Sequence, residues 1–174
     1  MKRKTKLLAG ICLSIIILLS CAKQPDADMG ELENQFSNLL PLADMNKSLQ
    51  IAVSTQEKSF KSGSEIELTV YNKSPYSFYF DNDTHVRLLG SSDNLLWTEV
   101  ENAITYSATM ILSPKGTTLL DTQPTWVKPI LDQSVFDAKK RNVLLRIAIV
   151  GEIMDGEIRT GKQVGAYIDV VLTP

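Results

Sequence analysis

Alternation of apolar and polar residues with a period of two dominates this chain from Leu49 onwards. The clearest stretches are 65–71 and 143–149, in which every second residue is a branched apolar one. A period of two places alternate side chains on opposite faces of a β-strand, whereas a helix needs a period of about 3.6. We therefore expect strands with one buried face. The predicted core includes Ile66, Leu68, Val70, Ile147 and Ile168.

Turn signals rich in Gly, Pro, Asn and Ser separate these stretches. They occur at 61–64, 72–75, 90–94 and 113–116, and Asp155-Gly156 favours a hairpin before a last strand expected from Val164 to Leu172. Long helical periodicity is absent after residue 48. The chain is therefore predicted to be all-β, with an antiparallel β-sandwich of about 7–9 strands over residues 49–174.

The first 20 residues are typical of an export signal. Lys2, Arg3, Lys4 and Lys6 precede an apolar run from Leu7 to Leu19. That run is shorter than the ~20 residues that a membrane-spanning helix needs. A basic start followed by a short apolar stretch predicts a secretory signal peptide over residues 1–20.

Leu18-Leu19-Ser20-Cys21 resembles the lipobox of bacterial lipoproteins. The resemblance implies that the Cys21 thiol carries a diacylglyceryl group, that cleavage occurs before Cys21, and that the new amino terminus is acylated. Cys12 would leave with the signal peptide, so the exported domain would have no cysteine pair for a disulfide. Ala22 after the lipidated cysteine is compatible with outer-membrane sorting in a Gram-negative host. In a Gram-positive host, the protein would stay on the outer face of the cell membrane.

Residues 21–48 are predicted to be the lipidated cysteine and a tether. A short helix over 29–40 is one interpretation, because Leu32, Phe36, Leu39 and Leu40 share one helical face and Pro41 would end it. The helix would pack on the domain edge or bind a partner. The other interpretation is a disordered spacer.

Residues 63–74, which read GSEIELTVYNKS, resemble the second strand of bacterial immunoglobulin-like domains. The likeness continues through Trp97, the turn at 112–116, Trp126 and Leu145-Arg146-Ile147, in the order found in the immunoglobulin-like domains of small bacterial lipoproteins. The chain is also similar to proteinase-inhibitor sandwiches of that type. The resemblance implies an immunoglobulin-like antiparallel β-sandwich.

One departure from that pattern lies before the long strand. Many relatives show Gly-x-Tyr-Arg there, where this chain has Asn142-Val143-Leu144-Leu145-Arg146.

Few residues suggest catalytic or metal chemistry. His85 is the sole histidine and no nucleophile-elbow motif is present, so we expect it on a sheet surface or edge. Asp81, Asp83 and Asp93 are a candidate calcium cluster, although turn formation also explains acidic residues there. Glu99 and Glu101 are expected on one solvated strand face. No motif predicts a cofactor.

The aromatic stretch Tyr76-Ser77-Phe78-Tyr79-Phe80 is expected to bury Phe78 and Phe80 and to turn Tyr79 outward, as a plausible contact point. Most other aromatic side chains, Trp97 and Trp126 among them, are expected in the core.

These features favour a membrane-anchored envelope lipoprotein with a non-enzymatic binding or accessory domain. It would contact the cell membrane or outer membrane through Cys21, with a protein or glycan partner. The net charge of −2 gives no support for nucleic-acid binding. One alternative is a proteinase inhibitor that presents residues 121–128 or 155–161. The other is a carbohydrate-active enzyme.

Overall fold

The computed structural model describes residues 40–82, 85–92, 96–117, 120–132, 134 and 142–174. The predicted signal peptide, Cys21 and nearly all of the proposed helix at 29–40 lie outside these residues. The first regular element is a single 3₁₀ turn, η1 (Leu42–Asp44). No helix within the described ranges is long and apolar enough to cross a bilayer.

The smaller sheet has three antiparallel strands in the order β1-β3-β9, namely β1 (Leu49–Val53), β3 (Ile66–Asn72) and β9 (Thr122–Val127). In β3, buried residues alternate with exposed or half-buried ones, as the sequence pattern predicts. β9 lies at one edge of this sheet, paired on its inner side with β3.

The larger sheet is built on a hairpin of two long strands, β11 (Val143–Asp155) and β12 (Ile158–Thr173). β5 (Val86–Ser91) and β4 (Ser77–Phe80) pair with β11 one after the other, along the edge that β12 does not use. Gly151 lies where β4 meets β11. A Cβ atom at Gly151 would come within 2.5 Å of the Tyr79 carbonyl oxygen, so only glycine permits this approach.

Five short strands complete the pairing. β2 pairs with β12 in parallel, while the other pairs, β8 with β4, β6 with β5 and β7 with β10, are antiparallel. Their bounds are β2 (Ser59–Lys61), β6 (Thr98–Glu99), β7 (Glu101–Asn102), β8 (Met110–Leu112) and β10 (Pro129–Ile130). The strand count is therefore higher than predicted, because the chain changes partners within short stretches.

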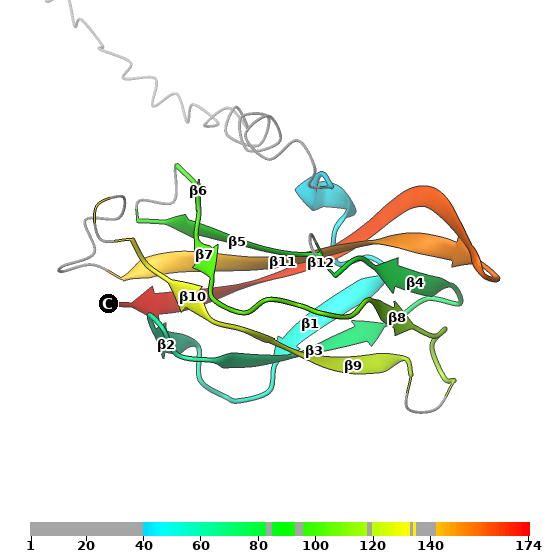
Figure 1. Ribbon diagram of the computed structural model, residues 1–174, viewed down its shortest axis with the longest axis horizontal. Coiled ribbons are helices and arrows are strands. Elements are labelled where there is room, and N and C mark those ends of the chain that lie inside the picture. Colours follow the sequence, from blue (N-terminus) through cyan, green and yellow to red (C-terminus); the bar gives the residue numbers. More distant parts are fainter. Residues whose placement is uncertain (1–39, 83–84, 93–95, 118–119, 133, 135–141) are drawn as a thin grey trace, which may run out of the picture.

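The two main sheets lie in layers with one hydrophobic core between them (Figure 1). Ile66, Leu68 and Val70 from the smaller sheet and Ile147 from the larger one are fully buried, which confirms the predicted core positions. Ile168 is partly buried and packs against the same core. The described chain is therefore nearly all β and mostly antiparallel, as expected.

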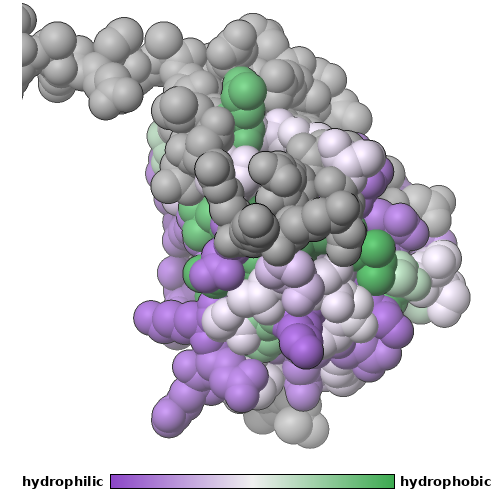
Figure 2. All heavy atoms as spheres, turned by 90° about the vertical axis from the view of Figure 1, so that its left-hand side faces the viewer, coloured by the Kyte–Doolittle hydropathy of each residue, from purple (hydrophilic) through white to green (hydrophobic). Residues whose placement is uncertain are grey.

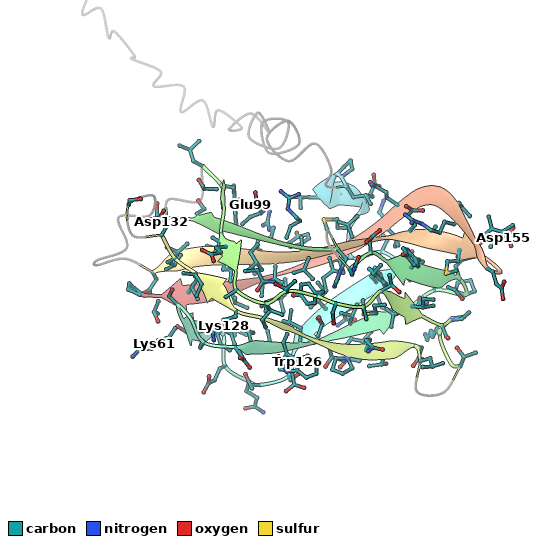
Figure 3. The ribbon with its side chains drawn as sticks, in the orientation of Figure 1. Lys61, Glu99, Trp126, Lys128, Asp132 and Asp155 are labelled. Atoms are coloured by element: carbon teal, nitrogen blue, oxygen red, sulfur yellow. The ribbon has the colours of Figure 1, made fainter. Side chains whose placement is uncertain are left out.

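The β11–β12 hairpin turns at Gly156 and Glu157, which confirms the hairpin predicted from Asp155-Gly156. Gly156 has a φ of 60°, in the left-handed region that glycine enters without strain. β12 begins at Ile158, earlier than the expected Val164. Figure 3 places Asp155 at one end of the molecule, away from Lys61 and Lys128.

The opposite end, which carries β2 and β10, is seen in Figure 2. Hydrophilic side chains cover much of it, and the visible apolar residues form separate small groups. No extended apolar surface is visible on this face among the described residues.

Asn46, near the start of the domain, forms two hydrogen bonds with the backbone of β12. Its backbone N–H donates to the Gly165 carbonyl oxygen at 2.9 Å, and its side-chain Oδ1 accepts the Tyr167 N–H at 2.9 Å. Asn46 has a φ of 61°, and Asn tolerates the left-handed region better than most residues. Met45 beside it is buried, with its Cε near Gly165. The chain therefore enters the fold along the edge of β12.

Candidate binding pocket

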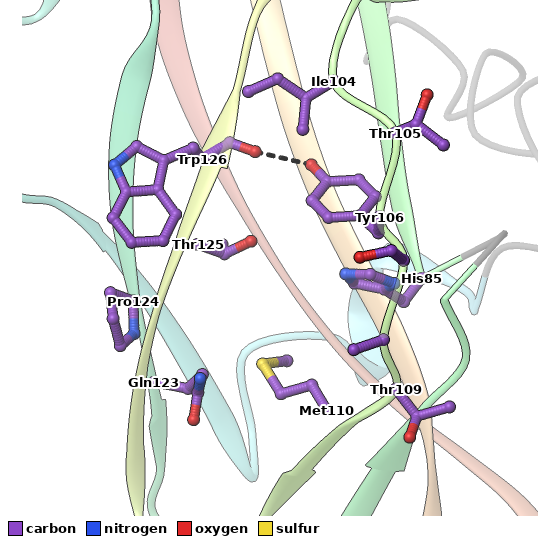
Figure 4. Close-up of a pocket in the computed structure, with 12 residues that line it drawn as sticks. His85, Ile104, Thr105, Tyr106, Thr109, Met110, Gln123, Pro124, Thr125 and Trp126 are labelled. Atoms are coloured by element: carbon purple, nitrogen blue, oxygen red, sulfur yellow. Dashed lines mark hydrogen bonds between the residues drawn. The ribbon is translucent and has the colours of Figure 1, made fainter.

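A pocket opens between the edge strand β9 and the stretch 103–112, which runs antiparallel to it. Backbone bonds join the two at one end, where the Ala103 N–H donates to the Lys128 oxygen at 2.9 Å. They meet again at the other end, where the Ser113 N–H donates to the Leu120 oxygen at 2.8 Å. Between these contacts the backbones separate and enclose a cavity of about 310 Å³ (Figure 4).

The separation leaves part of the β9 edge without a strand partner. The Trp126 carbonyl oxygen points away from β3, because it accepts a hydrogen bond from the Tyr106 hydroxyl at 2.7 Å. Alternate residues of a strand direct their polar backbone groups to the same side, so Pro124 also faces this edge. Proline has no N–H, which is why it is tolerated at such an edge position.

Asn102 organises the end of the pocket at which the two backbones are joined. Its Nδ2 donates to the Tyr106 hydroxyl oxygen at 3.0 Å. Its Oδ1 accepts from the Lys128 N–H at 2.9 Å and from the Ile104 N–H at 3.3 Å. One amide therefore fixes both walls and the tyrosine that crosses between them.

Tyr106 spans the gap with its ring. Burial raises the pKa of its hydroxyl, and hydrogen bonds from Asn102 and Thr125 oppose that rise. The hydroxyl is therefore protonated near neutral pH and can donate to the Trp126 carbonyl. The ring also packs against His85, with ring centroids 4.5 Å apart.

His85 lies at the inner end of the pocket, with only 3% of its surface exposed. Its Nδ1 contacts the Asp81 carbonyl oxygen, which can only accept, so Nδ1 carries the hydrogen. Burial lowers the pKa of the imidazole, against the opposing effects of the Asp81 carbonyl and carboxylate. The ring is therefore neutral near pH 7, with Nε2 as an acceptor, and Figure 4 shows its edge turned towards β9.

The burial of His85 shows that its expected position on a sheet surface is wrong. The residue precedes β5, and its carbonyl oxygen accepts the Val150 N–H at 2.9 Å, which holds it close to the sheet. Tyr106 from a distant stretch then covers the ring. Neighbouring residues in the sequence give no sign of that cover.

Hydroxyl and amide groups share the pocket walls with a slightly larger apolar surface, and no Asp, Glu, Lys or Arg is among the described residues that line it. Thr125 is buried at the side of β9, and Met110 adds apolar surface. The indole of Trp126 lies on the other side of β9, so this residue lines the pocket mainly through its backbone (Figure 4). The polar side chains that line the pocket, besides His85, are Thr105, Tyr106, Ser107, Thr109, Gln123 and Thr125.

The other predicted chemical candidates do not converge with this pocket. Asp81 contributes its carbonyl to His85, while Asp83 and Asp93 lie outside the described residues. Among the described residues, no group of three or more His, Cys, Asp or Glu side chains gathers in a way that could hold a metal ion. The calcium cluster therefore stays untested.

Glu99 and Glu101 do not share one strand, contrary to expectation. Glu99 belongs to β6, which pairs with β5, and Glu101 belongs to β7, which pairs with β10. The buried Val100 lies between the two strands. Both are exposed, as predicted, and Glu99 pairs with Arg87 at 2.9 Å. This arrangement gives no support for a paired-carboxylate site at these residues.

The aromatic stretch before β5 behaves as predicted. Phe78 and Phe80 are fully buried, and Tyr79 faces outward, where the Arg159 guanidinium lies 4.5 Å from its ring centre. Trp97 is buried beneath Arg146, whereas Trp126 is 44% exposed, so the expectation that both lie in the core is wrong for Trp126. Its position on the solvent face of the edge strand explains that exposure.

The two segments considered for protease contact are mainly strand rather than loop. Residues 122–127 form β9, paired with β3, and 155–161 comprise the last residue of β11, the turn at 156–157 and the first residues of β12. The pocket itself was missed by the sequence patterns. The signals available were the alternation of apolar and polar residues over 104–110 and Pro124, a residue that strands tolerate mainly at a sheet edge.

Comparisons with known proteins place the chain in no family: no protein-family model and no curated protein matches it. Among solved structures, it is similar to Spo0M, a sporulation control protein from Bacillus subtilis, at 10% identity and a TM-score of 0.36. That match covers 73% of this chain but only 50% of Spo0M. A second match, at 12% identity and a TM-score of 0.31, covers 75% of this chain and 91% of AvmM, which is described as catalysing macrocyclisation in alchivemycin A biosynthesis. Likenesses this low define neither a shared fold nor a shared function.

Proposed function

We propose that this protein is a lipid-anchored protein of the bacterial cell envelope whose β domain is a non-enzymatic binding or accessory module. The observation that carries the proposal is Leu18-Leu19-Ser20-Cys21 directly after a basic and apolar leader. The first strand, β1, begins at Leu49, and we propose that the residues between Cys21 and this strand form a tether.

The layered antiparallel sheets around one core support an immunoglobulin-like β-sandwich as the finer description of the fold. Such sandwiches host many functions, so the fold alone does not select one. The open edge of β9 and its pocket favour binding, because hydroxyl, amide and imidazole side chains line the pocket and can contact a ligand. We propose a protein or glycan partner in the envelope, and no nucleic acid.

Lipidation would fix the location of the domain on the cell membrane or outer membrane. Each buried CH₂ of a lipid chain contributes ~0.8 kcal/mol, and two chains or more give stable anchoring. A tethered domain meets partners on the same surface at a high effective concentration. Weak contacts are then sufficient for function.

The test is metabolic labelling of Cys21→Ala in cells fed an alkyne fatty acid. We expect the variant to lose the label and to accumulate as uncut precursor, because the thiol that receives the lipid is gone. Cys12→Ala is the matched control, since it removes the chain's other cysteine from the part predicted to be cleaved off. Equal labelling and processing of Cys21→Ala and wild type would overturn the lipoprotein proposal.

A further inference from the structure

We propose that the pocket between β9 and residues 104–110 binds a neutral, hydroxyl-rich ligand of the size of one sugar residue. The inference rests on the domain being a binding domain but does not depend on the lipid anchor. It is drawn from the size of the pocket, the uncharged side chains among its described lining residues, the closure of both its ends and the polar groups at its inner end.

The size of the cavity limits the ligand to a small molecule or a single unit of a polymer. At about 310 Å³ it lies at the lower end of the roughly 300–1,000 Å³ that is usual for ligand pockets. A single ring with its substituents suits such a volume. The pocket opens to solvent beside the exposed Thr105 and Thr109, so further units of a polymer would extend outwards.

The uncharged character of the described lining residues disfavours the common ionic ligands. None of the described residues that line the pocket is a Lys, Arg, Asp or Glu, and the buried His85 is held neutral. A carboxylate or phosphate moved into this site would lose its hydration and gain no counter-charge, which is costly. A purely apolar ligand would leave the hydroxyl and amide groups without partners.

An extended peptide fits the β9 edge poorly. Strand addition needs a free row of alternating donors and acceptors, but here backbone bonds close both ends of the gap. Pro124 in the middle of the open stretch offers an acceptor and no donor. The free edge is therefore too short and too poor in N–H groups for strand addition.

The groups at the inner end suit a hydroxyl that both donates and accepts. Nε2 of His85 accepts, because Nδ1 holds the ring hydrogen against the Asp81 carbonyl. The hydroxyl of Thr125 bonds to Tyr106 and keeps lone pairs for a ligand. The Tyr106 ring and Met110 supply apolar surface for the C–H side of a sugar ring.

The experiment is an NMR titration of the mature protein in detergent micelles. The chain has a single histidine, so the imidazole Cε1–H signal reports on the pocket without ambiguity. The probes are D-glucose, D-galactose and N-acetyl-D-glucosamine, with glucuronate as the charged counterpart and a capped, uncharged tetrapeptide as the peptide counterpart. We expect a saturable shift with at least one neutral sugar and none with glucuronate or the peptide.

Three variants assign the binding to the hydroxyl of Thr125. Thr125→Val should weaken sugar binding about tenfold, as expected for a lost buried hydrogen bond, while Thr125→Ser should keep it. Thr69→Val on the neighbouring strand β3 makes the same change outside the pocket and should bind like the wild type.

Several results would overturn the proposal. These are no shift with any neutral sugar, an equal shift with glucuronate or the peptide, unchanged binding by Thr125→Val, or equal loss in Thr125→Val and Thr125→Ser. None of them bears on the lipid labelling of Cys21, so failure of the ligand proposal and failure of the anchor proposal are distinguishable.

Discussion

Two antiparallel pairings in this protein have opposite characters. β11 and β12 pair almost without interruption from Val143 opposite Leu172 to Asp155 opposite Ile158, with one register shift near the hairpin. β9 and the stretch 103–112 meet only at their ends and part in the middle. The first pairing contributes more than a third of the buried core residues, whereas the second holds the pocket.

The difference shows that the backbone polar groups at a strand edge can stabilise the fold when they are paired and can bind a ligand when they are not. Between β11 and β12, the backbone N–H and C=O groups pair with each other. They therefore carry no free-energy penalty for unpaired polar groups. In the open seam between β9 and 103–112, side chains such as Asn102 and Tyr106 replace part of the ladder. The remaining polar groups are left for solvent or for a ligand.

Ile147→Ala should produce the largest effect, because it breaks the complete pairing at a fully buried position between Leu88 and Ile168. We expect the free energy of unfolding to fall by about 2–5 kcal/mol, measured by denaturant titration. Ile111→Ala, at a half-exposed site, is the control and should stay within about 0.5 kcal/mol of wild type. An equally small loss for Ile147→Ala would contradict the described core.

Asn102→Ala should have an intermediate effect and act on the seam alone. It leaves the Lys128 and Ile104 N–H groups without their acceptor and removes one donor to the Tyr106 hydroxyl, at a cost of about 1–3 kcal/mol. Hydrogen exchange should accelerate at Lys128 and stay slow at Ile147. The exposed Asn142→Ala is the matched control. Unchanged exchange at Lys128 would mean that Asn102 does not hold the seam.

The smallest effect is expected from acid, through His85. Its pKa is lower in the folded protein than in the unfolded chain, where it is about 6.5, so the unfolded state binds the proton more readily. The stability is fully present above the unfolded pKa and falls as the pH drops from there towards the folded pKa. Denaturant titrations across this range should show a steeper decline for wild type than for His85→Gln. Parallel curves would show that the imidazole is not buried in the folded state.

The sequence predicts the features that depend on local patterns, namely the period of apolar residues and the residues typical of turns. The alternation at 65–71 and 143–149, the Asp155-Gly156 turn and the burial of Phe78 and Phe80 all follow from period and turn chemistry. Strands of two residues, such as β6 and β7, are too short to show a period. These short strands form where the folded chain brings their residues beside another strand, β5 for β6 and β10 for β7.

The pocket depends on contacts between distant parts of the chain. Tyr106 reaches His85 and Trp126 only after β9 has come alongside the stretch 103–112. No local pattern near His85 encodes that approach, so its burial could not be read from its neighbours. Cys21 is the reverse case: its motif is explicit in the sequence but lies outside the described residues.

The attachment of Asn46 to β12 has a mechanical consequence for a protein held at its N-terminal side. A pull along the chain from the proposed anchor would reach the two Asn46 hydrogen bonds, to Gly165 and Tyr167, before it reached the ladder between β1 and β3. Two bonds and the packing of Met45 would yield first. Each residue released would lengthen the tether by about 3.3–3.6 Å. Under load, the domain would therefore give way at this attachment and move further from the membrane, while the seam and its pocket remained folded.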